Sequence, residues 1–184
     1  MINAIIDQIY GLFERFGAES YGENATQLQH ALQVAELARR NGCTSELIAA
    51  SLLHDIGQFI DDAGNAAEAL GIDARHEIIG ARFLEAQFPA RVSEPVRLHV
   101  AAKRYLCAVE PVYLANLSHA SRLSLKYQGG PMTLEEARAF EAEPLYADAV
   151  TLRRFDDTGK QPDWHPPDLA SYRTLLESLL ISHL

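Results

Sequence analysis

Apolar side chains recur at steps of three and four residues along most of the chain, which is the pattern of an α-helix with one buried face. The first such stretch ends at Gly17, and its apolar residues are Ile5, Ile6, Ile9, Leu12, Phe13 and Phe16. A second stretch runs from about residue 25 to 40 and stops at Asn41-Gly42. A third, residues 47–54, is apolar on every side, which predicts a central helix covered by the others.

Further helices are predicted along the rest of the chain, punctuated by prolines: 74–88, 92–101, 112–127, 134–142, 145–154 and 169–183. Residues 57–71 are rich in Asp, Asn, Ala and Gly and are predicted to form a loop of low order. The sequence contains no internal repeat and no convincing pair of strand patterns. It therefore predicts an all-α helical bundle, formed as a single domain over residues 1–184.

The amino-acid composition and net charge argue against some classes of binding partner. Hydrophobic residues make up 48% of the chain and the formal net charge is -9, which argues against a general nucleic-acid binder. A small anionic substrate stays possible, because a local cluster of Lys and Arg can oppose the global charge. No apolar run is long enough to span a membrane, the N-terminus lacks a basic signal region, and Cys43 and Cys107 are expected to be reduced. We therefore expect a cytoplasmic protein without membrane or nucleic-acid partners, either a monomer or a small homo-oligomer.

Imidazole and carboxylate side chains recur at spacings that predict an intramolecular metal cluster. The adjacent pair His54-Asp55 ends the wholly apolar third helix, where an unpaired carboxylate would cost on the order of several kcal/mol. A cation would keep this charge buried, and Asp55 could bridge two ions while His54 holds one of them. Nitrogen and oxygen donors of this kind suit iron, manganese or zinc. The other candidates are His30, His76, His99 and Asp156.

The stretch Leu53-His54-Asp55-Ile56-Gly57 is similar to the signature of the HD-domain superfamily. In that family one His comes from a preceding helix, two ligands from the HD pair and the last from a later Asp. The resemblance implies two metal ions, with the ligands His30, His54, Asp55, His76, His99 and Asp156. Residues 154–160 also resemble the Asp-x-x-x-Lys pattern that closes the site of myo-inositol oxygenase, which favours Asp156 over Asp157.

Metal ligands alone do not separate the two reaction classes of this superfamily, phosphohydrolases and O2-activating oxygenases. Residues 22–33 and 117–132 resemble the phosphonate-degrading HD oxygenases. This resemblance implies a mixed-valence di-iron centre (Fe2+/Fe3+) that uses O2 to cleave the C–P bond of a small 1-hydroxyphosphonate with release of phosphate. The alternatives are a metal-dependent phosphohydrolase that acts on a small phosphate ester or nucleotide with Mn, Mg or Zn, and a catalytically silent ligand-binding module.

The same resemblance implies residues for substrate binding and catalysis. Lys103, one helical turn after His99, and Ser121 would bind the phosphonate oxygens. Glu23 would face the substrate amine and, with Lys103, belong to the catalytic set. Gln58 stands where the glycine-forming relative has a histidine, and its amide can still donate a hydrogen bond to an oxyanion.

Further side chains around these positions could support the site. Gln27 and Gln33, on the turns around His30, could orient the ligands. The glycine-forming relative has a tyrosine that can reach iron where this chain has Ser20, and Tyr21 is displaced by one position. The aromatic residues Tyr21, Phe59 and Tyr105 could line a pocket for a methylated ammonium group.

Overall fold

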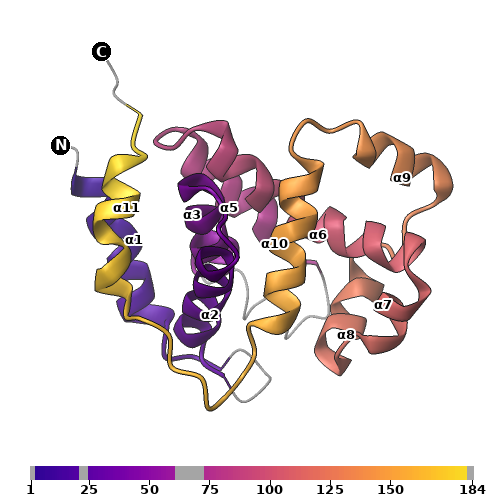
Figure 1. Ribbon diagram of the computed structural model, residues 1–184, viewed down its shortest axis with the longest axis horizontal. Helices are drawn as coiled ribbons and strands as arrows, with labels where there is room; N and C mark the ends of the chain where they lie inside the picture. Colours follow the sequence, from indigo (N-terminus) through magenta and orange to yellow (C-terminus); the bar gives the residue numbers. More distant parts are fainter. Residues whose placement is uncertain (1–2, 21–24, 61–72, 182–184) are drawn as a thin grey trace.

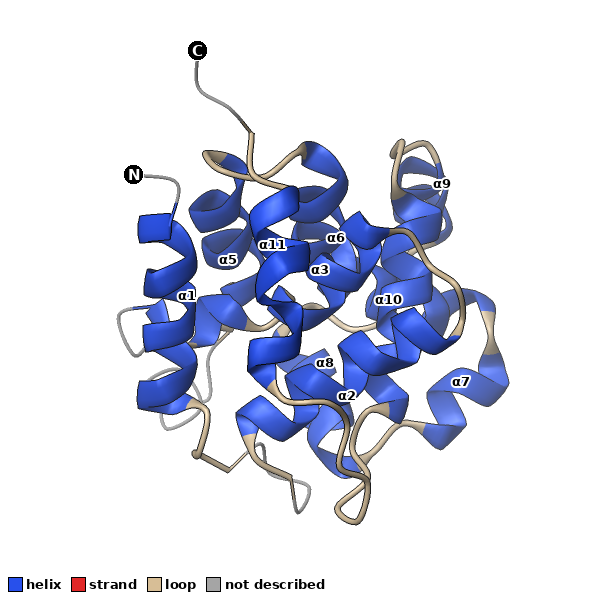
Figure 2. Ribbon diagram, turned by 60° about the vertical axis from the view of Figure 1, so that its left-hand side comes forward, coloured by secondary structure: helices blue, strands red, loops and turns tan. Residues whose placement is uncertain are grey.

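The computed structural model describes residues 3–20, 25–60 and 73–181, and these residues form helices joined by loops (Figures 1 and 2). The only strand-like pairing among them is an isolated bridge between Ser20 and Thr26. None of the described helices is long and apolar enough to cross a membrane. The prediction of an all-α fold is confirmed. The helices are α1 (Asn3–Phe16), α2 (Gln27–Arg40), α3 (Ser45–Leu53), α5 (His76–Glu85), α6 (Ala90–Val109), α7 (Pro111–Asn116), α8 (His119–Tyr127), α9 (Leu134–Glu141), α10 (Tyr146–Thr158) and α11 (Arg173–Ser178).

Helix α3 lies at the centre of the bundle, as its uniformly apolar sequence predicts. It contacts α2, α6, α10 and α11, and every residue from Leu47 to Leu53 is buried. The N-terminal α1 and the C-terminal α11 lie side by side at one end, whereas α7, α8 and α9 form the other end (Figure 1). The main hydrophobic core fills the space around α3, and it includes Ile6, Phe13, Leu52, Phe88 and Leu176.

Several predicted boundaries were wrong, for identifiable reasons. The helix expected over 92–101 is α6, which continues to Val109 because Leu106 and Cys107 are still buried against neighbouring helices. The helix expected over 112–127 is two helices, because Ser118 adopts an extended conformation and caps α8 by accepting from the amide of Ser121. The helix expected over 169–183 begins as a 3-10 turn (η3, Leu169–Tyr172) and continues as the short α11.

The loop predicted for 57–71 starts with ordered structure. The 3-10 turn η1 (Ile56–Gln58) follows Asp55 directly, and Gly57 is buried, so this part of the prediction was wrong. The backbone of η1 packs against that of α5, where Gly80 faces Gly57. A Cβ atom on Gly57 would overlap the carbonyl oxygen of His76 and lie 2.6 Å from the nitrogen of Gly80. Residues 61–72 of the predicted loop lie outside the described part of the chain.

We expect Gly57→Ala to lower the free energy of unfolding by about 1–3 kcal/mol, because the added methyl group forces η1 and α5 apart. Gly11→Ala is the matched control: Gly11 is exposed within α1, no atom lies within 4 Å of a Cβ placed there, and the change should be neutral or stabilising by up to about 1 kcal/mol. Urea unfolding of the metal-free proteins measures both. Equal effects of the two substitutions would contradict the close approach of η1 and α5.

Candidate dinuclear metal centre

Five elements of the bundle bring the six predicted ligand side chains to one place. α2 carries His30 on its buried face, His54 and Asp55 follow the last turn of α3, and His76 opens α5. His99 lies in the middle of α6, and Asp156 lies in the last turn of α10. The carboxylates and imidazoles are buried or nearly so, with His76 the most exposed of them at 14% of its side chain.

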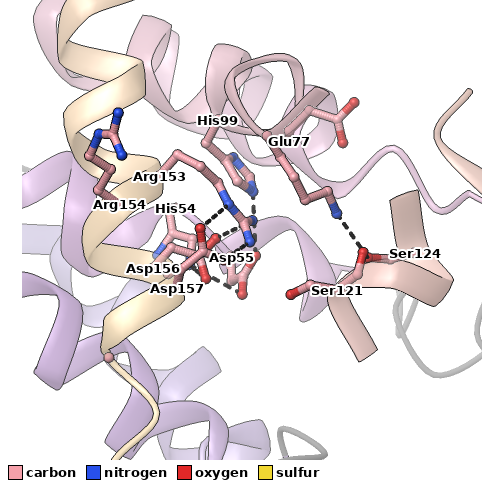
Figure 3. A network of polar contacts seen from close by, with 12 residues as sticks. His54, Asp55, Glu77, His99, Ser121, Ser124, Arg153, Arg154, Asp156 and Asp157 are labelled. Atoms are coloured by element: carbon pink, nitrogen blue, oxygen red, sulfur yellow. Dashed lines mark hydrogen bonds and ion pairs between the residues drawn. The ribbon is translucent and has the colours of Figure 1, made fainter. Parts of the chain in front are cut away.

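Asp55 is shared by two groups of potential ligands. One group is His30, His54 and Asp55, the other is Asp55, His76 and His99, and within each the donor atoms lie within 4.8 Å of one another. Asp55 Oδ2 lies 3.3 Å from His54 Nε2, while Oδ1 lies 3.1 Å from His76 Nε2. Each carboxylate oxygen therefore faces a different pair of imidazoles, which is the arrangement that a bridging ligand needs. Figure 3 shows Asp55 at the centre of this cluster, between His54 and His99.

The tautomers of the imidazoles test whether these residues fit metal ions. The Nδ1 atoms of His30, His54 and His99 lie 2.7, 2.9 and 2.7 Å from the carbonyl oxygens of Gly159, Ser51 and Val96. Because a carbonyl only accepts, each Nδ1 carries a proton, and in the neutral ring Nε2 is then an unprotonated acceptor. Yet His30 Nε2 and His54 Nε2 are 3.2 Å apart, and His76 Nε2 and His99 Nε2 are 3.1 Å apart. Where both facing nitrogens are acceptors, as in neutral His30 and His54, they repel unless a proton or a metal ion lies between them, so the donor set fits bound metal ions.

The carboxylates of the site stay charged. Burial by itself would raise the pKa of Asp55, but the charge of His54 and hydrogen bonds from His54 and His76 lower it well below its usual value. For His54, burial opposes protonation, but the charge of Asp55 and its hydrogen bond raise the pKa to about 9. Burial, with the nearby positive charges of His76 and His54, lowers the pKa of His99 to about 3. Without metal, protonation is therefore favoured at His54 and disfavoured at His99.

Asp156 and Asp157 have different surroundings, although they are adjacent in α10. Asp156 Oδ1 lies 3.4 Å from His30 Nε2, and its Oδ2 accepts from Arg153 Nη1 at 2.6 Å. Asp157 forms an ion pair with Arg153 and accepts a hydrogen bond of 2.5 Å from the hydroxyl of Tyr113. Figure 3 shows Arg153 directed toward both carboxylates, while Arg154 lies on the other side of the helix. The geometry thus places Asp156, and not Asp157, beside the imidazoles.

A cavity of about 570 Å³ opens onto Asp55, His76, His99 and Asp156. Positive and hydroxyl side chains form part of its wall: Lys103, Ser121, Ser124, Arg153 and Lys160. Lys103 Nζ donates to Ser124 Oγ at 2.8 Å, and Lys160 Nζ donates to Ser121 Oγ at 3.3 Å. Burial, followed by the charge of Arg153, lowers the pKa of Lys103 to about 7. Such a local cluster of positive charge can attract a small anion even though the protein is acidic overall.

The predicted substrate residues have different outcomes. Lys103, Ser121 and Gln58 line the cavity. Gln27, which was expected to orient metal ligands, also lines the cavity, and its Nε2 donates to Gln58 Oε1 at 3.3 Å. Glu23 and Tyr21 lie outside the described residues. Lys103 is 3% exposed and lies well inside α6, so it is no surface lysine at a helix end.

Three expectations for supporting residues are corrected. Phe59 is buried between Phe13 and Phe16, and Tyr105 packs on Phe140, so neither ring lines the cavity. Gln33 contacts no predicted ligand in the described structure. Its amide instead binds the backbone of Gln161 and Trp164.

Sequence reasoning missed part of the cavity wall. Arg153 lies three residues before Asp156 and Ser124 three residues after Ser121, so helical periodicity alone could have placed them on the same faces. Lys160 was recognised only as part of a motif. Glu19 and Gln128 also line the cavity, and no local pattern indicates this.

Comparisons with known proteins agree with the geometry. The sequence pattern of the HD domain matches residues 28–148. The chain is 42% identical to [1-hydroxy-2-(trimethylamino)ethyl]phosphonate dioxygenase (glycine-betaine-forming) of Leisingera caerulea, over 98% of this chain and 92% of the relative. It is 44% identical to hydroxymethylphosphonate dioxygenase of Gimesia maris, over 95% of this chain and 88% of the relative. An uncharacterised protein of Acanthamoeba polyphaga mimivirus is 38% identical over 93% of this chain and 80% of its own length. The chain therefore belongs to the HD domain family, as its signature predicts, and it is closely related to the phosphonate-degrading dioxygenases of that family.

Proposed function

We propose that this protein is an O2-dependent di-iron oxygenase that cleaves the C–P bond of a small 1-hydroxyphosphonate and releases phosphate. One observation carries the proposal: two His/Asp groups that share Asp55 open onto a cavity that is also lined by Lys103, Lys160, Arg153 and two serines. A dinuclear centre beside a buried site for a dianion suits a phosphonate better than a neutral substrate. The similarity to two phosphonate dioxygenases over nearly the whole chain supports the same reaction class.

In this proposal Asp55 bridges the two ions. His30, His54 and Asp156 complete one set of ligands, and His76 and His99 complete the other. A set of imidazoles and carboxylates accommodates iron, manganese or zinc, and the resemblance to oxygenases favours iron. When bound, two iron ions would supply the activation of O2, while oxidation of the substrate carbon to a carboxylate would supply the four electrons that reduce O2.

The protein side chains would position the substrate. Lys103 and Lys160 would bind phosphonate oxygens, with the hydroxyls of Ser121 and Ser124 holding the two ammonium groups in place. Arg153 adds a fixed positive charge that also orients Asp156. This leaves the rest of the cavity wall for the hydroxyl group and any substituent of the substrate.

The two relatives differ in the substituent that their names give to the substrate, a trimethylamino group in one and none in the other. The part of the wall that faces such a substituent would include the amides of Gln27 and Gln58 and the carboxylate of Glu19. Glu23 is our further candidate for a contact with a substrate amine. For the protein as a whole we propose a single cytoplasmic domain, monomeric or a small homo-oligomer, and the free thiols of Cys43 and Cys107 support this location.

The test combines the iron-loaded protein, O2 and both hydroxyphosphonates, and follows O2 consumption together with release of inorganic phosphate. We expect release of phosphate that requires O2, and a mixed-valence signal in electron paramagnetic resonance. Turnover of phosphate esters with Mn or Mg under argon, without attack on either phosphonate, would instead establish the hydrolase. Tight binding of a phosphonate without any turnover would establish a binding module.

A further inference from the structure

Residues 159–164, which we call the strap, follow α10 and lie along α2. Gly159 makes the first contact: its carbonyl oxygen lies 2.7 Å from His30 Nδ1. A Cβ atom on Gly159 would lie 2.7 Å from a methyl group of Val34, so the strap approaches α2 too closely for a side chain at this position. The strap therefore touches a predicted metal ligand through its backbone.

Gln33 makes the central contact between α2 and the strap. Its side chain is completely buried, and its three hydrogen bonds go to the strap backbone. Gln33 Nε2 donates to the carbonyl oxygens of Gln161 at 2.6 Å and Trp164 at 2.8 Å, and Gln33 Oε1 accepts from the amide of Gln161 at 2.9 Å. Both protons of the amide nitrogen are thus used, together with one acceptor site of the oxygen.

Apart from the buried bond between His30 and Gly159, the other side-chain contacts of α2 with the strap are more exposed. Gln29 Nε2 donates to the carbonyl oxygen of Pro162 at 3.0 Å, near the surface. The guanidinium of Arg40 lies 4.9 Å from the centre of the Trp164 ring. Because water can replace an exposed hydrogen bond but not a buried one, the strap depends on His30 at Gly159 and, beyond that residue, most on Gln33.

The strap also carries Lys160 into the cavity. Its Nζ lies 3.3 Å from Ser121 Oγ, and Lys160 is flanked in the chain by the two residues that α2 holds, Gly159 and Gln161. His30 and Gln33 lie one turn apart on the same face of α2. The same face of α2 therefore carries His30, a predicted metal ligand, and Gln33, which binds the strap that contains Lys160.

We infer that Gln33 is a positioning residue for substrate binding: by clamping the strap, it holds Lys160 against Ser121 and beside the predicted anion site. This inference rests on the proposed function, since it assigns Lys160 to a phosphonate oxygen. It makes Gln33 a determinant of substrate affinity, although its side-chain hydrogen bonds go to the strap backbone and it does not line the cavity.

The first measurement is hydrogen exchange at the amide of Gln161, whose partner is the Gln33 side chain. Gln33→Leu keeps the size of the side chain and removes the hydrogen bonds, and exchange at this amide should accelerate by about tenfold or more. Gln29→Leu, the matched control on the same helix, should leave it within about twofold of wild type. Gln33→Met, which also lacks the donors and the acceptor oxygen and has a side chain of similar length, is the second variant if the leucine variant does not fold. Unchanged exchange in the folded variant overturns the clamp.

The second measurement is binding of hydroxymethylphosphonate to the iron-loaded protein under argon, arranged as a double-mutant cycle with Lys160→Ala. Gln33→Leu alone should weaken binding by about tenfold, and in the Lys160→Ala background by less than about twofold, because the positioned group is already gone. If Gln33→Leu weakens binding equally with and without Lys160→Ala, Gln33 does not act by positioning Lys160. The failures are distinguishable: binding without turnover in O2 contradicts only the proposed function, whereas a wild type that binds neither this phosphonate nor inorganic phosphate contradicts both.

Discussion

Asp55→Ala yields a folded protein that retains neither metal ion and has no oxygenase activity. The two oxygens of this carboxylate face different imidazole pairs, at 3.3 Å from His54 Nε2 and 3.1 Å from His76 Nε2, so one substitution removes a donor from both groups. Loss of residues that merely support metal ligands costs about 10–100-fold in affinity, and loss of a shared ligand should exceed this. Metal content after exhaustive dialysis, determined by elemental analysis, measures the effect directly.

Asp157→Asn is the matched control for this prediction. Asp157 is also a largely buried carboxylate next to a predicted ligand, but it pairs with Arg153 and Tyr113 and faces no imidazole. We expect this variant to keep both metal ions. Loss of metal from Asp157→Asn, with retention in Asp156→Asn, would reverse our assignment of the last ligand. Retention of both ions in Asp55→Ala would contradict a bridging carboxylate.

Lys103→Ala should weaken phosphonate binding by about 10–100-fold and leave the iron content unchanged. The expected size corresponds to one charge-assisted hydrogen bond, about 1.5–3 kcal/mol. Lys103 is 3% exposed, lines the cavity and is held by Ser124, but it is no metal ligand. Lys126 on α8 is exposed and does not line the cavity, so Lys126→Ala is the control and should bind as the wild type does. Unchanged affinity in Lys103→Ala would remove this lysine from the phosphonate site.

We expect the affinity for phosphonate to depend on pH through the ionisation of Lys103. Burial and the charge of Arg153 lower the pKa of Lys103 to about 7, opposed by Asp156 and Asp157, while Lys160 adds to the lowering. The ammonium form, which binds an anion, is present below this pKa and is lost as the pH rises through it. Affinity should therefore fall above pH 7 by up to about tenfold per pH unit. Lys103→Arg stays charged at every pH tested, so the ratio of wild-type to Lys103→Arg affinity cancels the ionisation of the phosphonate itself. A ratio that is constant from pH 6 to 9 would contradict the prediction.

The residues of the candidate metal centre could largely be predicted from local signals together with the resemblance to the HD domain. The pair His54-Asp55 at the end of an apolar helix, and histidines at suitable positions in other helices, identify candidates without knowledge of the fold. The choice between Asp156 and Asp157 depended on a resemblance, and the structure separates them by their neighbours, His30 for one and Tyr113 for the other. The substrate-binding residues were harder to predict. No local sequence pattern shows that Phe59 and Tyr105 pack against other aromatic rings instead of lining the cavity.

The sequence by itself determined the helical class, the central position of residues 47–54 and the candidate ligands. Helical periodicity and donor chemistry are properties of short stretches, and short stretches can be read directly. The tertiary structure alone decided that α6 continues past Lys103, that Lys160 reaches Ser121 across 39 positions, and that Gln33 binds the strap 128 and 131 positions away. Such contacts depend on how the helices pack against one another. The residues involved are far apart in the chain, so no local sequence pattern indicates them.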